Sequence, residues 1–298
     1  MNKKYLSIFM VIAMALSVLA GCAAGNEQQG NEENGAEGTE EKGTLTFGLN
    51  NWAENIAVSN MWKVILEDKG YDVELKSMEK SPVWAGIAQG DLDVAAEVWL
   101  PTTDEPLYKE YKEDLVLGET WYKGTGLGLV VPEYMDIDSI EQLNEKKDEL
   151  GLEKIVGIDP GASLMKLTRT AMEEYNLNYE LTESSGPAMM SELEKAYKDK
   201  DPIVVTLWNP HWAFAEYDLK YLEDPKKVYG EADDIYYMTR TGFEEDHPEV
   251  VKWMNNWQMD DQSLGNLMAV IKDTDDAEEG ARKWIEDNQD LVDEWTKE

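Results

Sequence analysis

Short apolar runs alternate with stretches of helical periodicity in this chain, and that order restricts the fold more than any other feature. In the first block the apolar runs have the length of buried strands, and apolar residues recur at near-helical spacing between them. We expect strands over 44–49, 72–75 and 94–98, and helices over 56–69 and 82–89. Strand-helix-strand alternation predicts an α/β fold with largely parallel sheets.

The same alternation returns in the middle of the chain. We expect strands over 126–132, 154–158 and 202–207, with helices over 163–175 and 188–198 between them. Two blocks of the same kind indicate two similar lobes.

The remainder of the chain is expected to return to the first lobe. The run 235–239 has strand character, and helical patterns start after it near Pro248, Leu264 and Ala277. The chain would then cross the hinge between the lobes twice. We expect lobe 1 to comprise 44–125 and 240–298, and lobe 2 to comprise 126–239.

The N-terminus has the pattern of an export signal. Lys3 and Lys4 precede the apolar run 5–19, which ends in Leu-Ala-Gly-Cys at 19–22. The run is too short for a transmembrane helix, so residues 1–21 are interpreted as a signal peptide. The last four residues resemble a bacterial lipobox, which implies that Cys22 is lipidated and anchors the protein to the outer face of the cell membrane. The alternative is an ordinary signal peptide with a chance cysteine.

Composition restricts the structure and the partners further. Residues 22–43 are rich in Gly, Asn, Glu and Gln, which predicts a disordered linker. Cys22 is the only cysteine, so a disulfide within the molecule is excluded. The formal net charge is −35, and it becomes about −37 without residues 1–21, which hold two lysines and no acidic residue. Such a surface repels nucleic acid and anionic lipid, and neither is expected as a partner.

Three of the eleven tryptophans stand just after predicted strands. Trp52 follows 44–49, Trp99 follows 94–98, and Trp208 follows 202–207. Ligands bind at this edge of open α/β sheets, so we expect the three indoles to be partly exposed in a cleft. A trimethylammonium group cannot donate an N–H hydrogen bond, but each indole face attracts it by about 0.5–2 kcal/mol. The same faces also suit sugars.

Four separated motifs stand out. They are NWAE at 51–54, EVWLPTT at 97–103, GIDPGASLM at 157–165 and LWNPHW at 207–212. Together they resemble the signatures of glycine betaine-binding proteins of ABC importers, and the likeness runs from about residue 44 to the end. The resemblance implies a two-lobed periplasmic-binding-protein fold of type II, in which Trp52, Trp99 and Trp208 form an aromatic cage.

The resemblance also implies that the backbone amides of Ser163 and Leu164 hold the ligand carboxylate. The residues agree with this, because 159–163 precede a helical pattern and the N-terminus of a helix offers free N–H groups. The alternative is a simple helix start with Ser163 as the N-cap residue.

One position departs from the family pattern. Relatives often have a histidine three residues after Trp-Leu-Pro, where this chain has Asp104, preceded by Thr102 and Thr103. An ionised aspartate repels a carboxylate and attracts a cation. We expect a betaine, with Thr102, Thr103 or the amides compensating, and choline is the second candidate. The alternative is that Asp104 points to solvent as a helix cap and has no ligand role.

The remaining signals favour a binding protein over an enzyme. His211, beside Trp208, is expected either to line the cleft or to have a structural role. Catalytic motifs are missing and histidines and cysteines are too few for a usual zinc site, so we expect no catalytic residue, metal or cofactor. We therefore expect a monomeric binding protein that closes on a quaternary ammonium ligand and delivers it to the permease and ATPase of an ABC importer for osmoprotection. A saccharide-binding protein or glycosidase and an adhesive lipoprotein are the alternatives.

Overall fold

The computed structural model describes residues 42–297. The expected signal peptide at 1–21, the lipidation site Cys22 and the linker up to residue 41 lie outside the described residues. The linker is expected to include Lys42 and Gly43, but the structure attaches both to the first lobe. The Lys42 N–H donates to the Gly70 carbonyl, and the Gly43 carbonyl accepts from the Asp72 N–H, each at 3.0 Å. These two bonds extend the neighbouring strand pair backward, so Lys42 and Gly43 belong to the first lobe and not to the linker.

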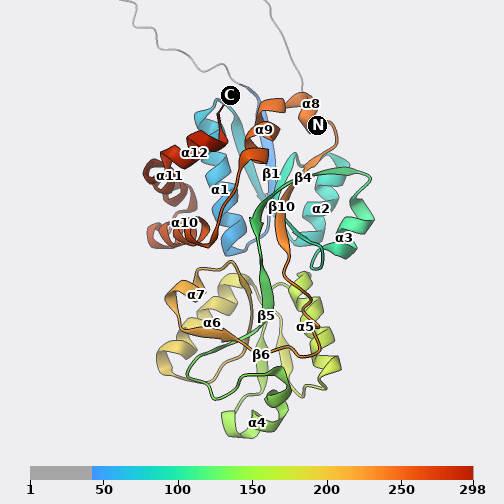
Figure 1. The fold of residues 1–298 in the computed structure, drawn as a ribbon, viewed down its shortest axis with the longest axis vertical. Coiled ribbons are helices and arrows are strands. Elements are labelled where there is room, and N and C mark those ends of the chain that lie inside the picture. The colour runs from blue at the N-terminus through green and yellow to red at the C-terminus, as the bar shows by residue number, and fades with distance from the viewer. Residues whose placement is uncertain (1–41, 298) are drawn as a thin grey trace, which may run out of the picture. The chain divides into compact units, whose positions relative to one another are not determined.

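Five strands form the first sheet, in the spatial order β2-β1-β3-β10-β4 (Figure 1). They are β1 (Thr44–Leu49), β2 (Asp72–Ser77), β3 (Val94–Leu100), β4 (Leu115–Lys123) and β10 (Asp234–Arg240). β1 pairs in parallel with β2 and β3, whereas β10 runs antiparallel to both β3 and β4. The sheet is therefore mixed, and the expectation of a largely parallel sheet is wrong at this edge.

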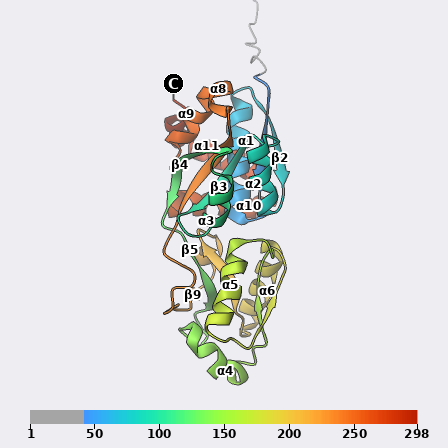
Figure 2. The same ribbon diagram turned by 90° about the vertical axis from the view of Figure 1, so that its right-hand side faces the viewer.

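Helices cover both faces of the first sheet. They are α1 (Ala53–Asp68), α2 (Lys80–Gln89), α3 (Glu105–Tyr111), α8 (Phe243–Asp246), α9 (Pro248–Asn256), α10 (Asp261–Thr274), α11 (Ala277–Asp287) and α12 (Gln289–Trp295). In Figure 1, α1, α10 and α11 lie on one side of the strands and α2 and α3 on the other, and Figure 2 views the lobe from the α2 side. No helix within residues 42–297 is both long and apolar enough to cross a membrane.

Residues of β3 contribute to two cores, one on each face of the sheet. Val94 and Ala96 pack in the cluster that contains the apolar face of α1, whereas Ala95 packs with the apolar residues of α2. Val98 also packs with α2, because the pairing of β3 with β10 shifts register between Ala95 and Val98. Successive side chains of a strand point to opposite faces, so a strand that is apolar throughout must be covered on both sides. The continuous burial of β3 thus follows from its central place in the sheet.

The second sheet also has five strands, in the order β7-β6-β8-β5-β9. They are β5 (Gly126–Pro132), β6 (Lys154–Val156), β7 (Glu180–Thr182), β8 (Val205–Asn209) and β9 (Leu219–Tyr221). The helices of this lobe are η1 (Ile140–Gln142), α4 (Leu143–Leu150), α5 (Ser163–Glu174), α6 (Gly186–Asp199) and α7 (Ala213–Glu216). β6 is parallel to β7 and β8, and β5 is antiparallel to β8 and β9.

The chain passes between the two sheets twice. The first passage joins β4 to β5 and the second joins β9 to β10. Lobe 2 is expected to run to residue 239, but β10 pairs with β3 and β4 from Asp234 onward, so that boundary lies too late in the chain. The buried side chains of Ile235 and Tyr237 belong to the core of the first lobe, which explains why the strand returns there.

The two sheets repeat one pattern of pairing. β1 and β6 occupy the same place in their sheets, and so do β3 and β8. The turn after β1 leads into α1, and the turn after β6 leads into α5. Two equivalent turns and two equivalent strand ends are thereby available to build one site, one of each from each lobe.

Candidate ligand-binding site

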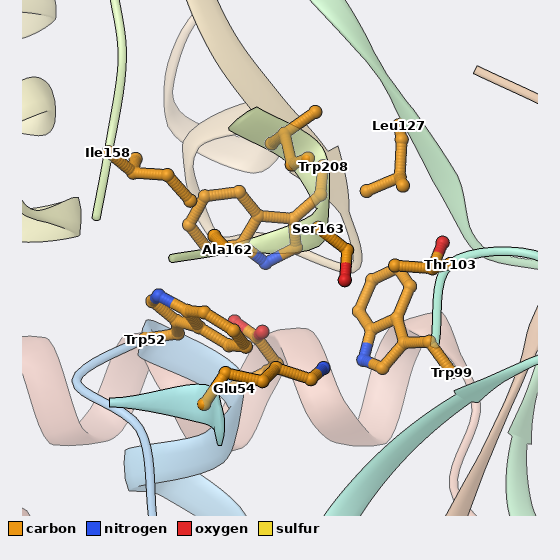
Figure 3. A pocket seen from close by; sticks show the side chains of 11 residues that line it. Trp52, Glu54, Trp99, Thr103, Leu127, Ile158, Ala162, Ser163 and Trp208 are labelled. Carbon is orange, nitrogen blue, oxygen red and sulfur yellow. The ribbon is translucent and has the colours of Figure 1, made fainter. Parts of the chain in front are cut away.

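A pocket lies between the lobes at the carboxyl ends of the equivalent strands (Figure 3). Its lining combines aromatic, aliphatic and a few polar side chains from both lobes. The lining residues are Trp52, Glu54, Lys80, Trp99, Thr103, Leu127, Ile158, Ala162, Ser163, Leu164 and Trp208. Six of the eight ligand-binding residues expected from the sequence lie in this lining, and Asp104 and His211 do not.

The three tryptophans converge on the pocket as expected, but they are more buried than expected. Trp52 is 8% exposed and Trp99 and Trp208 are each 3% exposed. The ring centroids of Trp52 and Trp208, which come from opposite lobes, lie 6.3 Å apart with their planes at 60°. The predicted partial exposure is wrong because each lobe covers the aromatic faces of the other. Trp99 and Trp208 also lie within β3 and β8, one residue before each strand ends.

Carboxylates orient two of the indoles. Trp52 Nε1 donates to Asp159 Oδ2 at 3.0 Å, and Trp99 Nε1 donates to Glu97 Oε1 at 2.8 Å. The indole N–H of Trp208 has no hydrogen-bond partner among residues 42–297. A rigidly held aromatic face loses little side-chain freedom when a cation binds it, which favours affinity.

The N-terminus of α5 faces the same pocket. Ala162 is the N-cap residue, with an extended backbone, and Ser163 is the first residue of the helix, so the alternative with Ser163 as the N-cap is wrong. The amides of Ser163 and Leu164 precede the first possible bonds within the helix, and no acceptor for either is found in the described part of the chain. These two N–H groups, at the positive end of the helix dipole, are suited to an anionic group.

Asp104 lies behind the pocket wall and is fully buried at 0% exposed, so the alternative that it points to solvent is wrong. Its Oδ2 accepts from the Trp99 N–H at 2.8 Å and pairs with Lys80 Nζ at 2.6 Å. Its Oδ1 accepts from the Ser163 hydroxyl at 3.3 Å, which links the two lobes. The side chain of Asp104 therefore positions other groups of the site.

Lys80 was not singled out from the sequence. It is the first residue of α2, only 3% exposed, and its ammonium lies 5.1 Å from the ring centroid of Trp52. A lysine in an acidic chain gives no signal of burial in its sequence neighbourhood. Its place in the pocket depends on the ion pair with Asp104, which is 24 positions away.

Two buried glutamates are the other functional residues that sequence reasoning missed. Glu54, in the first turn of α1, lines the pocket, and Glu97 of β3 lies beside it. Burial raises the pKa of Glu54 well above its ordinary value, and the neighbouring Glu97 adds to the shift. Burial also raises the pKa of Glu97. Glu54 belongs to the motif NWAE and Glu97 to the motif EVWLPTT, and this membership is the one sequence feature that could have indicated them as site residues.

Thr103 and His211 have different places. Thr103 lines the pocket, and its buried hydroxyl has no partner within the described residues. His211 packs edge-on against Trp208 at 5.0 Å, and its Nδ1 accepts from the Ala213 N–H at 3.1 Å. Burial lowers the pKa of His211 to about 3, so the imidazole is neutral near pH 7. The structural role considered for His211 fits this geometry.

The described residues hold no group of three or more histidine, cysteine, aspartate and glutamate side chains that is suited to a metal ion. The groups that the pocket presents to a ligand are aromatic faces, two free amides, one ammonium and a pair of carboxyl groups.

Residues 43–287 match the family described as the substrate binding domain of the ABC-type glycine betaine transport system. The chain belongs to this family. Members are transport binding proteins, not enzymes, and the expectation of a binding protein without catalytic activity is confirmed at the level of the family.

Several similar proteins can be compared with this chain. The glycine betaine/carnitine transport binding protein GbuC of Listeria monocytogenes serotype 1/2a (strain 10403S) is 46% identical over 145 residues, which is 48% of each chain. The chain thus spans about half the length of that relative in the match. The solved structure of lactococcal OpuAC, closed and complexed with glycine betaine, is 32% identical with a TM-score of 0.79, covering 85% of this chain and 99% of the other.

Another similar structure was solved with a different ligand. An ABC-transporter choline binding protein in complex with choline is 28% identical with a TM-score of 0.77, covering 85% of this chain and 91% of the other. These similarities confirm the expected two-lobed periplasmic-binding-protein fold, with the correction that both sheets are mixed.

Proposed function

We propose that the protein captures a quaternary ammonium solute outside the cell, with glycine betaine as the preferred ligand, and delivers it to an ABC permease. The observation that carries this proposal is the convergence of Trp52, Trp99 and Trp208 on one buried pocket. Three indole faces select a trimethylammonium group through cation–π attraction, which strengthens as water is excluded. A relative solved with glycine betaine supports the assignment.

The polar groups of the pocket lining favour a ligand that also carries a carboxylate. The free amides of Ser163 and Leu164 are aligned with the α5 dipole, and the Lys80 ammonium and the Thr103 hydroxyl lie in the same lining. A zwitterion would place its ammonium on the indoles and its carboxylate on these donors. Choline lacks the carboxylate and leaves the donors unpaired, a cost that a buried site does not recover.

Choline stays the second candidate for a specific reason. Glu54, Glu97 and Asp104 place three acidic side chains around one buried lysine, and a cation without a carboxylate gains from that excess. A relative solved with choline shows that proteins similar to this chain accept it.

Delivery requires that the closed form be distinguished from the open one. Contacts between the lobes, such as Ser163 to Asp104, form only when the two pocket walls meet, so ligand binding would shift the population toward closure. The permease would recognise that closed form. Lipidation of Cys22 would keep the monomer at the outer face of the membrane, where captured solute serves osmoprotection.

Calorimetric titration with glycine betaine and, separately, choline tests the function. The decisive variant is Ser163→Pro, because proline is tolerated at the first position of a helix and removes the amide N–H together with the hydroxyl. The preceding Ala162 already has the extended backbone that proline requires, with ψ 143°. Ser163→Ala is the matched control, since it removes the hydroxyl and keeps the amide.

We expect Ser163→Pro to weaken betaine binding about tenfold or more relative to Ser163→Ala, as for the loss of one hydrogen bond to a charged group. Choline affinity should be equal in the two variants. Equal betaine affinities would remove the amide from the carboxylate site. Failure of both ligands to bind the unmodified protein would refute the proposed function.

A further inference from the structure

Glu54 presents a buried carboxyl group to the pocket, close to the indole of Trp208 and to the carboxyl group of Glu97. The side chain lines the pocket and is 1% exposed, and neither Oε1 nor Oε2 has a partner among residues 42–297. Glu97, 3% exposed, uses Oε1 for the Trp99 indole N–H, and its Oε2 has no partner in the same part of the chain. Figure 3 shows the Glu54 carboxyl group beside Trp52, on the side of the pocket where the indoles converge.

Two buried carboxylates side by side cannot both be ionised without a counter-charge. The nearest cation is Lys80, and it is already paired with Asp104 at 2.6 Å. His211, which packs against Trp208, is neutral, and Asp159 accepts from Trp52 on the other wall. The charged groups around the pair therefore leave it without a full counter-ion. A proton shared between the two carboxyl groups relieves this repulsion, as in other paired carboxylates.

We propose that Glu54 and Glu97 share one proton in the ligand-free protein and release it to solvent when a quaternary ammonium group enters the aromatic pocket. The inference rests on the proposed function, since it takes the ligand to be a permanent cation or a zwitterion with a cationic end. No bond other than the O–H bond of the shared acid is broken. The incoming ammonium charge takes the place of the proton beside the two carboxyl groups, and the released proton goes to solvent.

The direction of the pH dependence follows from linkage. Burial raises the pKa of both carboxyl groups in the free protein, and the charge of Glu97 raises the pKa of Glu54 further. A bound cation lowers the pKa of both groups again. At a pH between the pKa values of the free and the ligand-bound protein, the ligand-bound form holds fewer protons. The affinity for the ligand therefore rises with pH in this range. A trimethylammonium group has no proton to lose, which makes the protein the source of any proton released.

Calorimetry in buffers with different heats of ionisation counts the protons. Glycine betaine binding would be measured at pH 7 in phosphate and in Tris, and again between pH 6 and 8. We expect release of about one proton for each ligand bound, and an affinity that rises by up to about tenfold for each pH unit within the titrating range.

The variants Glu54→Gln and Glu97→Gln replace the shared acid by an amide, which supplies a permanent N–H to the remaining carboxylate. Both should bind more weakly and release no proton. Glu67→Gln is the matched control on the same helix α1, since Glu67 forms a surface ion pair with Lys63 and should leave proton release unchanged. Proton release that persists in both pocket variants would overturn the proposal.

A second measurement does not depend on the ligand. The infrared spectrum of the ligand-free protein near pH 7 should contain the C=O stretch of a protonated, buried carboxylic acid, absent from both pocket variants and present in Glu67→Gln. Its absence from the unmodified protein would refute the shared proton even if glycine betaine binds. Conversely, if no quaternary ammonium binds, the function fails, and the infrared band alone still decides whether the acid pair is protonated.

Discussion

The indole N–H of Trp52 donates a 3.0 Å hydrogen bond to Oδ2 of Asp159, and this bond joins the two equivalent strand-to-helix turns of the two lobes. Trp52 follows β1 and precedes α1, and Asp159 follows β6 and precedes α5. The bond can exist only when the lobes meet. One tryptophan of the pocket lining thus depends directly on closure of the lobes.

Removal of this bond should weaken the closed state. We expect Asp159→Ala to raise the Kd for glycine betaine about five- to thirtyfold, as for the loss of about 1–2 kcal/mol in a charge-assisted hydrogen bond at a half-buried site. Stopped-flow tryptophan fluorescence should show a faster dissociation rate. Asp218→Ala, an exposed aspartate of the same lobe, is the control, and equal rates in the two variants would contradict the role of Asp159.

Trp208→Phe should separate cation recognition from core packing. The smaller ring offers a weaker face to a cation, so we expect about a tenfold loss of affinity with some loss of stability. Trp284→Phe is a close control, because Trp284 in α11 is also buried and its indole N–H has no partner within residues 42–297. Thermal unfolding and calorimetry on both variants should show similar losses of stability and a loss of affinity only for Trp208→Phe. The reverse result would remove Trp208 from the cage.

The contributions of Lys80 and Asp104 to the free energy of unfolding should depend strongly on each other, because the two side chains form an ion pair. Lys80→Met leaves a fully buried carboxylate without its cation, and we expect a loss of about 3–5 kcal/mol in the free energy of unfolding. Addition of Asp104→Asn should recover part of that loss, because an amide needs no counter-ion. Urea unfolding of the single and double variants gives the coupling energy. Breaking the exposed ion pair of Lys154 and Glu192 should lower the free energy of unfolding by less than about 1 kcal/mol in the same test.

His211 should make the fold sensitive to acid. Its pKa is about 3 in the folded protein, below the ordinary value of about 6.5, so the unfolded chain takes up the proton first as the pH falls. Stability that is complete above pH 6.5 is therefore lost toward pH 3, by roughly 2 kcal/mol at pH 5. His211→Asn keeps an acceptor for the Ala213 N–H and has no such titration. Urea unfolding at pH 7 and 5 should show a smaller loss in this variant, and equal losses would exclude His211 as the source.

The sequence predicted those parts of the fold that depend on neighbours along the chain. The strands and helices of each strand-helix-strand run are local patterns, so β1, β3 and α5 could be expected near their observed places. β4 could not, because Val116 is exposed and Gly118 interrupts the apolar pattern. Gly118 is needed for a reason visible only in three dimensions: a Cβ there would lie 2.1 Å from the Tyr237 ring of β10.

The residues of the pocket also divide into those that local sequence predicts and those that depend on distant contacts. The convergence of Trp52, Trp99 and Trp208 on one pocket follows from the rule that ligands bind at strand ends, which needs only the strand assignments. Glu54, Lys80 and Glu97 were missed because a charged side chain ordinarily indicates a solvated surface. Their burial depends on contacts between distant segments, above all Lys80 with Asp104. Asp104 itself was identified as unusual, but its role in holding Lys80 and Trp99 required the coordinates.

The position of β10 between β3 and β4 has a consequence for the order of folding. Because the chain is synthesised from its N-terminus, β4 lacks a partner strand until residues 234–240 have been made. All strands of the second sheet lie between Gly126 and Tyr221, so that lobe has its complete set of strands first. The inserted lobe can then complete its sheet while the host lobe still waits for its last strand, and the aromatic pocket assembles only at the end of synthesis.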